Sequence, residues 1–157
     1  MIKKMASFSP NQLGALISPA IFRTHIRPRL QPIVDLGAAY SIPVMFHSCG
    51  SSSWAFEDFI EMGIGIIDTL QPEAKDMAPA LLKGRFGDRL AFHGSISTGG
   101  PVAFGSVEDT IADVRQVLEV MKPGGGYALS PSHALQDNSP TENVVALYDA
   151  ARKYGVY

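Results

Sequence analysis

Short apolar runs alternate with amphipathic stretches along most of this chain. Four such runs, rich in Ile, Val, Leu and Phe, are typical of strands buried on both faces: 42–47, 63–70, 89–95 and 127–130. Apolar residues recur at helical spacing in the stretches that follow them: 54–62, 77–86, 106–121 and 141–154. The pattern predicts four strand–helix units, which indicate an α/β fold with a parallel sheet covered by helices.

The helix boundaries carry local signals of their own. Ser106 begins a Ser-x-x-Asp capping signature before the helix predicted at 106–121, and the glycine-rich turn at 123–126 ends it. A further helix is predicted at 19–40, where Pro28 and Pro32 are expected to bend it or split it into two pieces. The first 18 residues hold no convincing strand pattern, so this segment is expected to be atypical.

Polar side chains gather directly after each predicted strand. They come in pairs along the chain: His47 and Cys49, Gln71 and Glu73, His93 and Ser95, Ser132 and His133. In parallel α/β architectures the ligand site lies at the carboxyl ends of the strands. We therefore expect a small-molecule site at this edge of the sheet, with Gln71, Glu73, His93 and Ser95 as candidate substrate-binding residues.

Composition excludes several classes of protein. With 46% hydrophobic residues and a net charge of −2, the chain is neither disordered nor equipped with a nucleic-acid footprint. The longest stretch without charge, 36–56, contains proline, glycine and several serines, so no membrane span is expected. A single cysteine excludes an internal disulfide framework, and no leader-peptide pattern is present, so a cytoplasmic location is expected.

The length of the chain leaves two architectures open. An eight-stranded βα barrel needs roughly 250 residues, and this chain has 157. It is either half a barrel completed by another chain, or a small open α/β sheet. Because the two edges of such a sheet would stay unpaired, we expect a homodimer or pairing with a complementary half-barrel chain.

Several motifs, in their order along the chain, resemble one known family. They are the segments 12–19, 46–50, 68–73, 83–87, 92–94, 124–133 and 140–143. Together they resemble the uroporphyrinogen decarboxylase superfamily, and more narrowly its members related to cobalamin-dependent methyltransferases. The resemblance runs from Gln12 to Tyr157 and implies the C-terminal half of a (β/α)8 TIM barrel. It makes residues 1–157 one half-barrel domain, with 1–18 as its atypical start.

The pair His47 and Cys49 suggests a metal site. Residues two apart in an extended chain point the same way, and an imidazole with a thiolate favours zinc. In the related methyltransferases zinc is held by a His-x-Cys pair and a later cysteine, and the resemblance puts His133 in that third place. In a flat sheet the first and fourth predicted strands lie about 14 Å apart, so this ligand set requires curvature.

The resemblance implies a leading function and two alternatives. The leading expectation is zinc-dependent transfer of a methyl group from a corrinoid or related donor, with a corrinoid protein as a possible partner, to a thiol. The first alternative is cofactor-free decarboxylation of a porphyrinogen, in which His133 would assist proton transfer or position a carboxylate. The second is a non-catalytic half-barrel, since Ser7 and Phe8 stand where the family carries an acidic pair.

The same residues also have plainer interpretations. Cys49 is equally compatible with a small buried thiol. His93 can simply hydrogen-bond within the mouth of the barrel. His25 lies among Arg23, Arg27 and Arg29 and is expected to be solvated.

Overall fold

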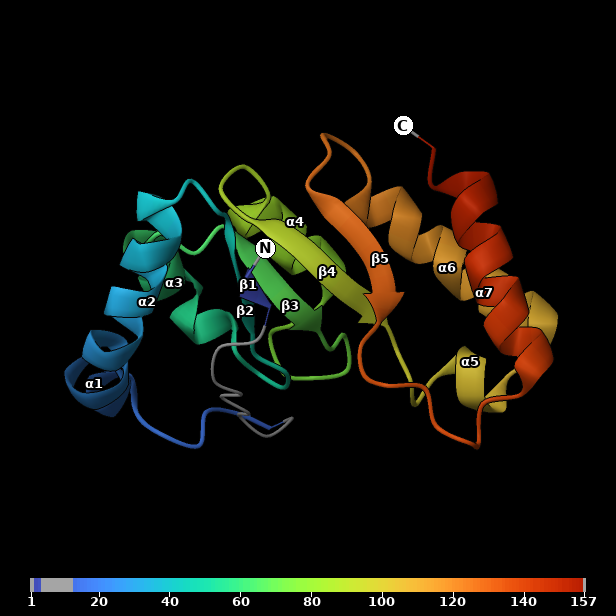
Figure 1. Ribbon diagram of the computed structural model, residues 1–157. Coiled ribbons are helices and arrows are strands. Elements are labelled where there is room, and N and C mark those ends of the chain that lie inside the picture. The colour runs from blue at the N-terminus through green and yellow to red at the C-terminus, as the bar shows by residue number, and fades with distance from the viewer. Residues whose placement is uncertain (1, 4–12, 157) are drawn as a thin grey trace.

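A parallel sheet of five strands forms the centre of the computed structural model, which describes residues 2–3 and 13–156 (Figure 1). The strands are neighbours in chain order: β1 (Ile2–Lys3), β2 (Val44–His47), β3 (Ile66–Leu70), β4 (Ala91–Ile96) and β5 (Tyr127–Pro131). The four strands predicted from the apolar runs are confirmed. The expectation of a strand-free N-terminal segment is wrong, because β1 pairs with the start of β2. Ser7 and Phe8 lie outside the described residues.

Helices follow the strands as the sequence pattern predicts. They are α1 (Pro19–Ile21), α2 (Arg27–Ala39), α3 (Phe56–Met62), α4 (Pro79–Phe86), α5 (Pro101–Phe104), α6 (Val107–Met121) and α7 (Thr141–Tyr154). In Figure 1, α4 and α6 lie behind the sheet, α2 and α3 stand beside β2, and α7 lies beyond β5. None of the described helices is long and apolar enough to cross a membrane.

The helix predicted at 19–40 is divided. A π-helical turn at Phe22–Ile26 separates α1 from α2, and a 3-10 turn at Ser53–Ala55 leads into α3. Pro28 occupies the first turn of α2, where its missing N–H costs nothing, while Pro32 lies inside that helix. The division falls just before Pro28, because a proline there cannot continue the hydrogen bonding of a preceding α-helix.

Aromatic packing holds the helices to one face of the sheet. Phe46 on β2 contacts Phe59 on α3 with ring centroids 4.8 Å apart, and Phe56 meets Phe86 of α4 at 5.3 Å. Ile67 and Phe92, the second residues of β3 and β4, are fully buried in this layer. Their neighbours in the strands are only half-buried and face the other way, since side chains alternate along a strand. The second face of the sheet is therefore partly open, as expected of half a barrel.

The loop after β4 contains a short helix that the sequence pattern did not predict. Asn143, at the start of α7, is buried and its amide donates to the carbonyl of Gly105 at 2.9 Å. The same amide lies 3.4 Å from the carbonyls of Pro101 and Val102. This side chain therefore fastens α5 to α7. Directly after α5, the predicted capping box of α6 is confirmed, with Ser106 and Asp109 bonded reciprocally.

Candidate functional site

Three polar side chains form a row across the middle of the sheet. His47 is the last residue of β2, and the parallel register places it beside Asp68 of β3, which lies beside His93 of β4. His47 Nδ1 is 2.7 Å from Asp68 Oδ2, and His93 Nδ1 is 2.6 Å from Asp68 Oδ1. One carboxylate therefore binds two imidazoles, one with each oxygen. We call these residues the His–Asp–His row.

The row lies on the partly open face of the sheet. The exposed fractions of the side chains are 25% for His47, 18% for Asp68 and 28% for His93. Ile67 and Phe92 alternate with them and bury the opposite face. Alternation within each strand and parallel register between strands together place all three polar groups on one surface.

Charge in the row is held by hydrogen bonds. Burial acts to raise the pKa of the Asp68 carboxyl, but the hydrogen bonds from His47 and His93 outweigh it and bring that pKa well below its usual range. The hydrogen bond to Asp68 raises the pKa of the His47 imidazole, against an opposing effect of burial, and the contact with Cys49 adds to the increase. Asp68 is thus an anion that stabilises the proton on His47.

Cys49 links the row to a cavity. Its thiol lies within hydrogen-bonding reach of the His47 side chain, and the same residue lines a polar cavity of about 490 Å³. Residues that follow four different strands line this cavity: Cys49, Gln71, Glu73, Thr98, Ser132 and His133. The structure thus brings Gln71, Glu73 and His133 together with Cys49 at the carboxyl ends of the strands. A hydrogen bond from the Gly50 N–H to Gln71 Oε1, 3.1 Å long, ties the first two loops together.

Two other predicted residues, His133 and Ser95, lie apart from the His–Asp–His row. His133 is exposed, and its Nδ1 faces the carbonyl of Ala134 at 3.4 Å and not the His47–Cys49 pair. Two strands, β3 and β4, separate the strand that carries His47 from the strand that leads to His133. Ser95 is fully buried and is not among the residues that line the cavity. Within the described part of the chain, no group of three His, Cys, Asp or Glu residues is arranged to hold a metal ion.

Sequence reasoning did not single out Asp68. A signal was present, because this carboxylate interrupts an otherwise apolar strand, where an unpaired charge is costly. His25 is exposed as expected. Arg23 and Arg27, on either side of His25, bind the buried carboxylate of Asp58 at 2.9 and 3.0 Å.

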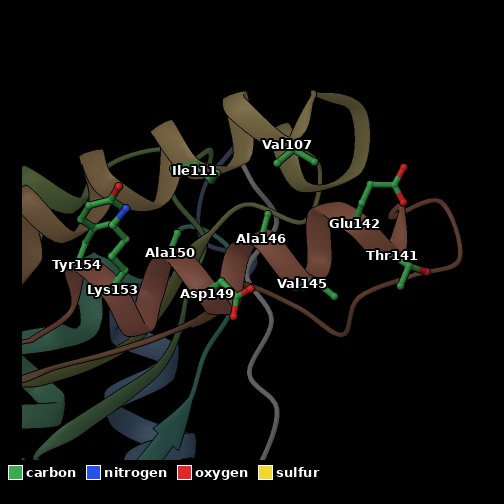
Figure 2. Close-up of a pocket in the computed structure, with 10 residues that line it drawn as sticks. All are labelled: Val107, Ile111, Thr141, Glu142, Val145, Ala146, Asp149, Ala150, Lys153 and Tyr154. Carbon is green, nitrogen blue, oxygen red and sulfur yellow. The ribbon is translucent and has the colours of Figure 1, made fainter.

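A larger groove lies elsewhere and holds none of the candidate residues. Its volume is about 710 Å³, and it runs between α6 and α7. Figure 2 shows Val107 and Ile111 on one side of it and Ala146 and Ala150 on the other. Val145 and Tyr148 of α7 are also about half exposed. This is an apolar surface of the helical layer, away from the carboxyl ends of the strands.

Comparisons with known proteins agree with this architecture. The model of the family described as uroporphyrinogen decarboxylase (URO-D) matches residues 6–154. A uroporphyrinogen decarboxylase of Anaeromyxobacter dehalogenans is 27% identical over 128 residues, which are 82% of this chain and 35% of that protein. One from Coxiella burnetii is 22% identical over 147 residues, 91% of this chain and 39% of that protein.

A solved structure shows the same fold. A methyltransferase from Methanosarcina mazei superposes with a TM-score of 0.69 at 22% identity, covering 96% of this chain and 42% of that one. The chain thus spans less than half the length of the relatives that it matches. Its parallel sheet and helices correspond to part of a TIM barrel. On the family match over nearly its whole length, this chain belongs to the uroporphyrinogen decarboxylase (URO-D) family.

Proposed function

We propose that this chain provides part of a methyltransferase-type site, in which a methyl group passes from a corrinoid or related donor to a thiol. The observation that carries the proposal is the contact between Cys49 and His47 at the end of β2, beside the polar cavity. An imidazole and a thiol in contact at a strand end are the donors that zinc prefers. Asp68 on the far nitrogen of His47 supplies the carboxylate that usually supports a zinc-binding histidine.

Two of the three proposed zinc ligands, His47 and Cys49, are already in contact with each other. His47 and Cys49 would hold the ion, and bound zinc keeps a substrate thiol deprotonated at neutral pH. His133 lines the same cavity as Cys49 and is the third ligand in this proposal, although its ring is turned toward Ala134 in the structure. The roles of the chain's own residues are to orient the His47 ring through Asp68 and to enclose the substrate with Gln71 and Glu73.

Charge in the cavity favours this function over decarboxylation of a porphyrinogen. A polycarboxylate substrate needs cations around it, but no Lys or Arg is among the described residues that line the cavity, and Glu73 adds a negative charge. Against this, the curated relatives are uroporphyrinogen decarboxylases. A complementary half-barrel is a further source of cations, so the experiment includes this substrate.

The test measures zinc first and turnover second. Chain purified from zinc-replete medium is expected to hold about one zinc per site, and Cys49→Ser and His47→Gln are expected to lose it. His25→Gln, an exposed histidine away from the site, is the matched control and should retain the metal. Full zinc retention in the Cys49→Ser protein, or none in the unmutated protein, contradicts the proposal. Turnover of uroporphyrinogen that survives Cys49→Ala would assign decarboxylation instead.

We also propose that the open face and edges of the sheet are covered by a complementary half-barrel. The residues of β5 are half-exposed or exposed, unlike the buried interior of β3 and β4, and the apolar groove on α7 lies beyond this edge. Helices of a βα barrel pack against their neighbours on both sides. In this proposal a helix of the complementary half-barrel therefore covers the groove. We expect a homodimer of the isolated chain by light scattering at micromolar concentration, and a monodisperse monomer would contradict the proposal.

A further inference from the structure

We infer that Asp68 is a positioning residue that fixes His47 and His93 as a pair, each with its Nδ1–H bound to the carboxylate and its Nε2 as the acceptor nitrogen. This inference concerns the site of the proposed function, and it brings His93 into that site as the second imidazole. His133, which the family resemblance favoured, makes no hydrogen bond to Asp68.

The register of the sheet makes the pairing rigid. Asp68 lies directly between His47 and His93 on adjacent strands, and each of its oxygens binds one ring nitrogen, at 2.7 and 2.6 Å. Both bonds are short, as expected where the acceptor is charged. A carboxylate can only accept, so each histidine must place its proton on Nδ1. The remaining nitrogen of each neutral ring is then an acceptor.

The close approach of β3 and β4 just beyond the row supports this arrangement. A Cβ placed on Gly94 would lie 2.6 Å from both the Leu70 nitrogen and Thr69 Oγ1, so only glycine fits there. The backbone of Gly94 has φ of +120°, which side-chain-bearing residues rarely adopt. His93 therefore sits on a strand that is pressed against β3, within reach of the Asp68 carboxylate.

A carboxylate is required at position 68 because an amide cannot accept a hydrogen bond from both histidines. Asn has one acceptor oxygen and one donor nitrogen, so Asn at position 68 could accept from one ring only. The other ring would have to move its proton to Nε2 in order to accept from the amide. Asp68→Asn is thus expected to keep the size of the side chain and to change the tautomer of one histidine.

The experiment is nitrogen NMR of histidine-labelled protein at a pH where the rings are neutral. In the unmutated chain, His47 and His93 are both expected to carry the proton on Nδ1. In Asp68→Asn, one of them is expected to switch to Nε2–H, while Asp137→Asn, which removes an exposed carboxylate, should change neither. If zinc binds, Asp68→Asn should also weaken its affinity about 10- to 100-fold.

The results separate this inference from the proposed function. Protonation on Nε2 of either His47 or His93 in the unmutated chain overturns the inference, and so does a folded Asp68→Asn protein in which both rings keep Nδ1–H. If Asp68 only holds the strands together, Asp68→Asn would lower the stability of the protein and leave the protons of both histidine rings on Nδ1. Correct tautomers in a chain that binds no zinc would leave the inference standing and contradict the proposed function alone. The spectrum of the unmutated chain decides the matter even if Asp68→Asn does not fold.

Discussion

Replacing Asn143 by alanine tests how the loop after β4 is held in place. The buried amide makes one good hydrogen bond, to the Gly105 carbonyl at 2.9 Å, and two at the limit of 3.4 Å. The Pro101 carbonyl would keep other donors, the Gly105 N–H at 2.8 Å and Thr110 Oγ1 at 3.3 Å. The loss is therefore mainly that of the donor to the half-buried Gly105 carbonyl, with the weaker contact to the buried Val102 carbonyl lost as well.

The expected magnitude follows from that single lost partner. Leaving a buried acceptor unsatisfied costs about 1–3 kcal/mol. Because Gly105 is only half-buried, Asn143→Ala should lower the free energy of unfolding by an amount in the lower part of this range, about 1–2 kcal/mol. For a chain of this size each kcal/mol corresponds to a shift in Tm of roughly 2–4 °C. Urea unfolding and calorimetry measure both quantities, and Asn138→Ala, which truncates an exposed asparagine, is the control.

A second variant, Asn143→Asp, tests the same contact by placing a negative charge there. Asn143→Asp would aim a carboxylate at carbonyl oxygens, so its folded-state pKa should rise and the variant should be less stable than Asn143→Ala at neutral pH. Its destabilisation should diminish as the pH falls and the carboxylate becomes protonated. Surface substitutions usually change the free energy of unfolding by no more than about 0.5 kcal/mol. If the free energies of unfolding of Asn143→Ala and the control differ by less than this, the account of the α5–α7 attachment is refuted.

Two further predictions follow from local geometry. Gly94→Ala is expected to unfold at a lower denaturant concentration than Gly84→Ala, because a Cβ at Gly84 has open space around it and a Cβ at Gly94 does not. Equal unfolding midpoints for the two variants would show that β3 and β4 can separate freely. Hydrogen bonds from the Ser106 backbone and side chain hold the pKa of Asp109 below its ordinary value, so its contribution to stability is present above the unfolded-state pKa and is lost as the pH falls through the folded-state pKa. The difference in Tm between the unmutated chain and Asp109→Asn should accordingly shrink in acid, and a difference that grows in acid would contradict the capping role.

The sequence pattern was sufficient for the main elements because each satisfied a local rule. Uninterrupted apolar runs predicted β2 to β5, and the capping signature at Ser106 located the start of α6. The short helix α5 escaped prediction because four residues are too few to show a helical period, and a buried contact from Asn143 stabilises it. β1 was missed because two residues carry no alternation.

The location of the candidate site could be predicted from the sequence, but the side chains that bind one another there could not. Polar residues after the strands indicated the edge of the sheet at which Cys49, Gln71, Glu73 and His133 line one cavity. Which histidines pair was not accessible, because that depends on the register between strands, which brings Asp68 between His47 and His93. The family resemblance favoured His133, while the register pairs His93 with His47 through Asp68.

The division of the site between strands and loops has a consequence for how its chemistry can be altered. The His–Asp–His row belongs to the paired strands β2, β3 and β4 themselves, whereas the residues that line most of the cavity belong to the loops beyond them. Loops accept insertions and exchanges far more readily than paired strands. Loop grafting should therefore change which molecule is selected while the reactive groups stay in register, which makes this chain a scaffold for directed evolution of selectivity.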